Sequence, residues 1–171
     1  MKKIILTSVF LSFVMFIHAQ CVKPEYFIVK SKKSEGYSIN GQSKSGYFEP
    51  GEVYEMSFIA YSGMEYKITV GADVSDKDGQ IEFELYEKKN KRSEVNGKIT
   101  YKKVDQVVFK NKDNEMTQSM EFQSTATRRI YVRVQVPKTD GETGAAESYV
   151  CVGVLLEHQQ GVKTGGGFKQ R

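Results

Sequence analysis

The chain has 171 residues, with 25 lysines and arginines against 21 aspartates and glutamates, and two histidines. Without Lys2 and Lys3, which lie in a predicted leader, the balance is 23 against 21, and this small excess argues against a dedicated nucleic-acid binder. His158 is then the one histidine left, which excludes multi-histidine zinc sites and means that any serine–histidine or cysteine–histidine nucleophile would have to use it.

Residues 1–20 have the pattern of a secretory signal peptide. Lys2 and Lys3 precede an apolar run at 4–17, and Ala19 supplies a small residue near the expected cleavage point. The run is 14 residues long, whereas a membrane-spanning helix needs about 20. We therefore expect an exported mature chain with no transmembrane helix and enough length for one domain.

Both cysteines, Cys21 and Cys151, lie in the predicted mature chain. In an oxidising compartment we expect them to form a disulfide, whose long loop would stabilise the fold by about 4–5 kcal/mol on a chain-entropy estimate. Lipidation of Cys21 is the alternative, because bacterial lipoproteins carry their lipid on a cysteine directly after the leader. That pattern needs a small residue just before the cysteine and usually a leucine three before it, and Gln20 and His18 occupy these positions. Two free thiols are the third alternative.

Alternation of apolar and polar residues predicts β-strands along most of the mature chain. The polar stretch 31–46 is expected to be a loop or an irregular edge. Strands are expected at 53–61, 64–70, 80–89, 98–110, 116–122, 129–137 and 149–156. The last of these is apolar on both faces, as in a central strand.

Turn residues separate these runs. Ser62-Gly63 and Asn96-Gly97 are short enough for hairpins. Seven or eight short strands joined in this way predict an all-β protein, an antiparallel β-sandwich or jelly roll formed by one domain at 21–158. Residues 159–171 contain four glycines and little apolar surface, which predicts a flexible tail.

The acidic residues give no strong catalytic or metal signal. Asp73, Asp76 and Asp78 are weak calcium candidates, because only one alternating pair precedes the glycine at 79 and no helices flank it. An Asp-Gly turn is the favoured interpretation, and no cofactor is predicted. Glu82 and Glu84 share a strand face at a spacing that glycosidases use, but we expect them to be solvent-facing solubility residues.

Two groups of side chains are candidates for binding. Basic residues gather around one predicted hairpin: Lys88, Lys89, Lys91, Arg92, Lys98, Lys102 and Lys103. They would meet an acidic partner or lipopolysaccharide phosphates, or would simply protect strand edges from aggregation. The candidate binding aromatics, at loops or strand ends and in the tail, are Tyr37, Tyr47, Phe48, Tyr61, Tyr101 and Phe168. Such rings anchor partners or cap a sandwich core.

Residues 51–157 resemble the small β-sandwich domains of the pre-peptidase C-terminal type, which are appended to secreted bacterial peptidases. The resemblance is carried by GEVYEMSFIAYSGMEYKITV, GQIEFELYE, MEFQSTATRRIYVRVQVP and SYVCVGVLLE. It implies a non-catalytic domain that assists secretion, localisation or substrate binding, here expected to act without an attached peptidase. The leader ending in Ala19-Gln20 and the closing CVGVLLEHQQGVKTGGGF also resemble small exported proteins of Bacteroidota.

These features predict a non-catalytic exported binding module, an accessory subunit of a cell-envelope or secretion-related complex. Its partner would be an envelope protein, met in the periplasm or at the cell surface. We expect loop aromatics at one end of the sandwich and the glycine-rich tail to make the contacts. The alternative is a carbohydrate-binding module, assisted by calcium, whose ligand would be a glycan. A small hydrolase using His158 is a third class, for which no nucleophile motif is found.

Overall fold

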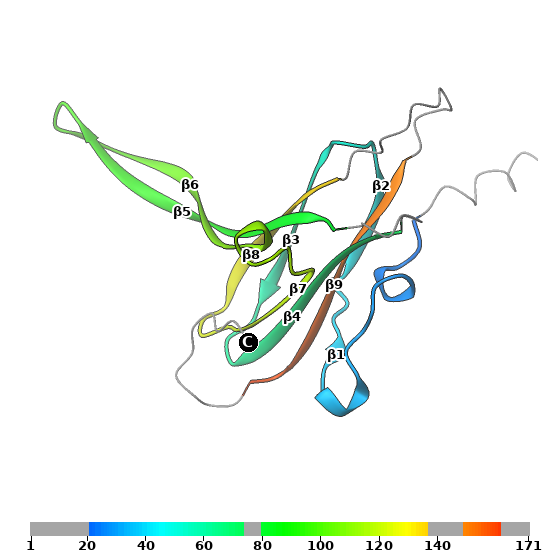
Figure 1. Cartoon of the computed structure of the whole chain (residues 1–171). Helices are drawn as coiled ribbons and strands as arrows, with labels where there is room; N and C mark the ends of the chain where they lie inside the picture. The colour runs from blue at the N-terminus through cyan, green and yellow to red at the C-terminus, as the bar shows by residue number, and fades with distance from the viewer. Residues whose placement is uncertain (1–20, 74–79, 137–148, 162–171) are drawn as a thin grey trace, which may run out of the picture.

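The computed structural model describes residues 21–73, 80–136 and 149–161, and within them two antiparallel sheets pack face to face (Figure 1). One sheet has the order β1-β9-β4-β7, with β2 also paired to β9, and the other has the order β3-β8-β5-β6. The strands of the first are β1 (Ser38–Ile39), β2 (Lys44–Phe48), β4 (Met64–Asp73), β7 (Ser119–Gln123) and β9 (Val150–Gln160). Those of the second are β3 (Val53–Ala60), β5 (Glu82–Val95), β6 (Lys98–Lys110) and β8 (Arg128–Gln135). The predicted all-β sandwich is confirmed.

The core lies between the sheets and follows the period of two along each strand. On β8 the inward residues Ile130, Val132 and Val134 are fully buried, while Arg129 is exposed. The same alternation on β4 buries Tyr66, Ile68 and Val70. Aromatic rings fill the space near one end, where Phe58, Tyr66 and Phe122 pack together. No helix in the described ranges is long and apolar enough to cross a membrane.

The number of strands differs from the prediction, and the polar stretch 31–46, expected to be a loop or an irregular edge, contains β1 and the start of β2 at the edge of a sheet. The described chain has nine strands, since β1 and β2 pair with one edge of β9 through Ser38↔His158 and Lys44↔Val154. Residues 31–46 carry no apolar alternation, because these strands are held by backbone hydrogen bonds and not by a buried face. β9 has partners on both edges, and its predicted central position is confirmed.

The predicted tail begins too early. β9 continues to Gln160, and Gln159 and Gln160 lie opposite Glu65 and Met64 of β4. Because β4 offers backbone partners over its full length, these two polar residues remain in the strand. Residues 162–171 and the predicted leader lie outside the described ranges.

The N-terminal segment, residues 21–36, is fastened to the outer face of β9 and β4. The predicted disulfide is present and joins Cys21 to Cys151, whose Cα atoms are 5.6 Å apart. Further along, the Ser31 amide and hydroxyl donate to the buried Glu157 carboxylate at 3.0 and 2.9 Å. A β-carbon on Gly153 would lie 2.6 Å from the Phe27 ring, so the segment needs a glycine there to approach so closely.

Candidate functional site

The most distinctive feature of the surface is a hairpin that leaves the sandwich. Pairing of β5 with β8 ends at Tyr86↔Tyr131, but pairing of β5 with β6 continues to Val95↔Lys98. Residues 88–105, which we call the arm, therefore form a two-stranded ribbon that projects from the sheets (Figure 1). All arm residues are exposed except Val104, which is half-buried.

Two local features shape the arm. Its tip is the Asn96-Gly97 turn, in which both residues have positive φ values, 52° and 73°, as a two-residue hairpin turn requires. At its base, the register of β5 against β6 shifts between Leu85 and Tyr86, so that Val108 has no partner there. Such a bulge bends a strand pair, and it lies where β5 loses its β8 neighbour.

Aromatic and charged side chains brace the base of the arm on the outer face of the β3-β8-β5-β6 sheet. The rings of Tyr86 and Tyr131 stack with centroids 5.1 Å apart, and the Lys88 ammonium lies 4.2 Å from the Tyr131 centroid. The Tyr86 hydroxyl donates a hydrogen bond to Glu55. Burial, and then Glu55, raise the pKa of Tyr86, whereas the bond from Tyr86 is the largest cause lowering the pKa of Glu55.

Arg133 connects the arm to the rest of the sheet. From the middle of β8 it donates to Asp105 on β6 at 2.9 Å and to Glu84 on β5 at 2.6 Å, and it lies 3.4 Å from Glu55 on β3. Hydrogen bonding to Asp105 is the largest cause raising the pKa of the guanidinium. On the opposite face of the same sheet, the buried Glu87 pairs with Arg128 at 2.6 Å. The arm is thus held at its base on both faces.

The strand register gives the arm two different faces, because side chains of directly paired residues share a face. Lys91 lies opposite Lys102, Lys89 opposite Val104 and Lys98 opposite Val95. We call the surface formed by Lys89, Lys91, Lys98 and Lys102 the lysine face. Within the described residues, no carboxylate lies within ion-pair distance of Lys91, Lys98 or Lys102, whereas Lys89 pairs with Glu87.

The other side of the arm, which we call the tyrosine face, is amphipathic. Arg92 lies opposite Tyr101 and Glu94 opposite Ile99. Tyr101 is 70% exposed and Ile99 is 47% exposed, so both offer apolar surface to a partner. Arg92 pairs with Glu94 at 3.4 Å along its own strand. The basic cluster and Tyr101, both candidates from the sequence, therefore come together in one structural unit.

The other predicted aromatics do not join Tyr101. Phe48 stacks on Tyr54 at 4.4 Å, and Tyr47 precedes it on β2, opposite Cys151. Tyr61 follows β3 at the far end of the sandwich, where Met64 pairs with Gln160. Ten residues of β9 separate these ends, which corresponds to about 33 Å. Tyr37 lies elsewhere, near the Lys67 ammonium, and Phe168 is outside the described ranges.

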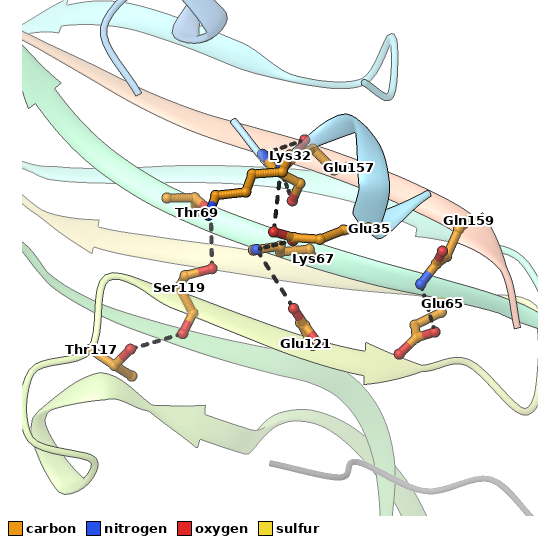
Figure 2. Close-up of polar contacts among 11 residues, drawn as sticks. Lys32, Glu35, Glu65, Lys67, Thr69, Thr117, Ser119, Glu121, Glu157 and Gln159 are labelled. Atoms are coloured by element: carbon orange, nitrogen blue, oxygen red, sulfur yellow. Dashed lines mark hydrogen bonds and ion pairs between the residues drawn. The ribbon is translucent and has the colours of Figure 1, made fainter. Parts of the chain in front are cut away.

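A second polar cluster links the N-terminal segment to the outer face of β4, β7 and β9 (Figure 2). Lys67 lies between Glu35 and Glu121 at 3.4 and 3.6 Å, and the bond from Lys67 lowers the pKa of Glu35. Gln159 donates to Glu65 at 3.0 Å. Because these groups are paired with each other across elements, the cluster is explained by attachment of the segment.

The remaining candidates do not form a site. Asp73 ends β4 and is exposed, while Asp76 and Asp78 lie outside the described ranges. In the part of the chain that the structure describes, no group of three or more histidine, cysteine or acidic residues is arranged to hold a metal ion. Glu84 is not a free surface residue as expected, since Arg133 and Lys110 pair with it. His158 packs beside Tyr66, with ring centroids 6.3 Å apart.

No family model and no curated protein matches the chain. Among solved structures, it is similar to PliG of Aeromonas hydrophila, a periplasmic inhibitor of g-type lysozyme, at 12% identity and a TM-score of 0.40, covering 77% of this chain and 93% of that one. It is also similar to a de novo designed double-stranded β-helix, at 14% identity and a TM-score of 0.24, covering 68% and 97%. With TM-scores below 0.5, neither likeness bears on what this chain binds.

Proposed function

We propose that this protein is a non-catalytic, exported interaction protein that contacts a partner protein through the arm. The disulfide between Cys21 and Cys151 supports export, because such bonds form and persist in oxidising compartments. An accessory subunit of a cell-envelope or secretion-related complex is the role that fits these features. The dispersion of the aromatic residues gives no support to the alternative of a carbohydrate-binding module.

The observation that carries the proposal is the pairing of Lys91 with Lys102 on an exposed ribbon. Like charges directly opposite each other destabilise a strand pair, and ordering backbone that buries little surface costs conformational entropy. A hairpin that only connected β5 to β6 would turn near Tyr86 and avoid both costs. An ordered cationic arm beyond that point is explained by a partner that supplies the missing contacts.

Site-specific photo-crosslinking tests this proposal with controls that the chain itself provides. A photoreactive phenylalanine replaces Tyr101 in one variant, and in two others it replaces Tyr26 or Tyr47, which are exposed and lie beside β9 of the other sheet. Irradiation of cells that express each variant should give a discrete adduct from position 101 and much less from the controls. Adducts from the control positions alone would overturn the proposal.

A further inference from the structure

β6 presents a free strand edge along the arm. Among the described residues it pairs with β5 alone, and it is the last strand of the β3-β8-β5-β6 sheet. Its outward backbone groups are therefore open to an added strand, which is a common way for a sheet to bind an extended peptide. Lysines along such an edge disfavour its pairing with other copies of itself.

The side chains of β6 define what such a strand would carry. Lys98, Thr100 and Lys102 alternate with Ile99 and Tyr101, so one face of the edge is cationic and the other is apolar. A neighbouring strand has the same period of two, and its side chains fall beside these in rows. Acidic residues would meet the lysines, and apolar residues between them would cover Ile99 and Tyr101.

Two other binding modes of the arm explain fewer observations: binding of a polyanion to the lysine face, and addition of a strand to the β5 edge. A phosphate- or sulfate-rich polymer would neutralise the lysine face but leave the backbone edge and the exposed Ile99 and Tyr101 unused. The outer edge of β5 is cationic on both faces, with Lys89 and Lys91 on one and Lys88 and Arg92 on the other. The amphipathic edge is therefore that of β6.

We propose that the β6 edge between Lys98 and Lys102 binds an extended segment of the partner as an added strand, in which acidic residues alternate with apolar ones. This inference rests on the proposed function and specifies the chemistry of the partner. Charge attraction would align the segment, backbone hydrogen bonds would hold it, and the apolar residues would exclude water from Tyr101.

The first test uses the disulfide-bonded protein with synthetic peptides in a fluorescence-anisotropy titration. One peptide alternates glutamate with valine or tyrosine, and a second has the same composition with its glutamates in one block. Two further versions of the alternating peptide are N-methylated, one on all glutamate amides and the other on all apolar amides. We expect the alternating peptide to bind at least ten times more tightly than the block peptide, and only one methylated version to bind. Equal binding of all four, or displacement by inorganic polyphosphate with no preference among the peptides, would overturn strand addition.

The second test exchanges charges. Lys98→Glu together with Lys102→Glu should weaken the alternating peptide at least tenfold and should create binding of a peptide with lysines in place of the glutamates. Lys103→Glu, on the tyrosine face of the same strand, is the matched control and should not create that binding. Unchanged thermal unfolding would show that the variants fold. Failure of every peptide, with strong crosslinking retained at position 101, would overturn strand addition and leave the proposed function intact.

Discussion

Arg133 on β8 and Asp105 on β6 are hydrogen-bonded at 2.9 Å, although β5 lies between their strands. This contact reaches across the sheet to Asp105, at the base of the arm. Together with the bond from Arg133 to Glu84, it fixes the direction in which the ribbon leaves the sandwich.

Replacing this guanidinium should loosen the arm more than the sandwich. Arg133→Met removes the ion pairs of the guanidinium with Asp105 and Glu84, and we expect a loss of about 1–2 kcal/mol in the free energy of unfolding, since both pairs are partly exposed. Amide hydrogen exchange in residues 98–105 should accelerate markedly. Arg129→Met, on the same face of β8 but outside this network, is the control. Equal exchange in the two variants would contradict the bracing role.

Removing one charge from the lysine face should stabilise the protein. Lys91→Gln abolishes the like-charge pair with Lys102, for which we expect a gain of about 0.2–1 kcal/mol in chemical denaturation at low salt. The gain should shrink at high ionic strength, because exposed charges are screened. Lys103→Gln, whose opposite residue is Asn90, should give no such gain. A Lys91→Gln protein less stable than the wild type would refute the argument.

Glu55 should show the influence of Tyr86 on its titration. Its pKa is lowered in the folded state, so its stabilising contribution is present above the ordinary value of 4.5 and is lost as the pH falls through the folded pKa. Tyr86→Phe removes the largest cause and should raise the carboxyl pKa, which a carbon-13 NMR titration would measure. Tyr131→Phe, which retains the Tyr86 hydroxyl, should leave the pKa lowered. Identical titrations in the two variants would rule out the assignment.

The close approach of the N-terminal segment should make Gly153 intolerant of a side chain. Gly153→Ala places a β-carbon 2.6 Å from the Phe27 ring, and we expect a loss of about 1–3 kcal/mol in the free energy of unfolding. Gly41→Ala, where nothing lies within 4 Å of the new atom, should change stability little. Thermal unfolding of both variants under oxidising conditions makes the comparison. If both are equally stable, the segment does not pack as described.

Breaking the disulfide should destabilise the protein strongly. Cys21→Ser with Cys151→Ser opens a link between positions 130 residues apart, for which chain entropy predicts a loss of about 4–5 kcal/mol. Protection of the Ser31 amide should fall at the same time, because its bond to Glu157 relies on the segment staying in place. Denaturant unfolding with and without reductant checks the first point, and hydrogen exchange checks the second. If the denaturation midpoint of the wild-type protein does not change with reductant, the predicted contribution of the disulfide to stability is wrong.

The sandwich was predictable because its core strands alternate cleanly. Periodicity places Ile130, Val132 and Val134 on one face whatever their neighbours are, and Asn96-Gly97 specifies a hairpin by its own turn chemistry. β1 and β2 were missed because backbone pairing with β9 leaves no apolar pattern in the sequence.

The residues of the candidate site could be predicted from the sequence, but their arrangement on a projecting two-stranded ribbon could not. The basic cluster and Tyr101 are evident from the sequence, but alternation does not reveal whether a third strand flanks a hairpin. The departure of the arm depends on where β8 stops pairing and on a one-residue bulge at Leu85/Tyr86. The network around Arg133 joins four strands, and their adjacency is a property of the topology.

The bulge at Leu85/Tyr86 lies between two parts of the chain with different requirements: the sandwich must pack a core, whereas the ribbon has only to keep its length and the orientation of its faces. Beyond the Lys88↔Asp105 pair, every side chain of the ribbon except Val104 is exposed, so the ribbon can be lengthened or shortened there without repacking the core. Deleting two residues from each strand would shorten its reach by about 7 Å and keep both faces as they are. Deleting one from each would turn the outer part of the ribbon over relative to its base. Reach and facing are therefore adjustable in this protein independently of folding.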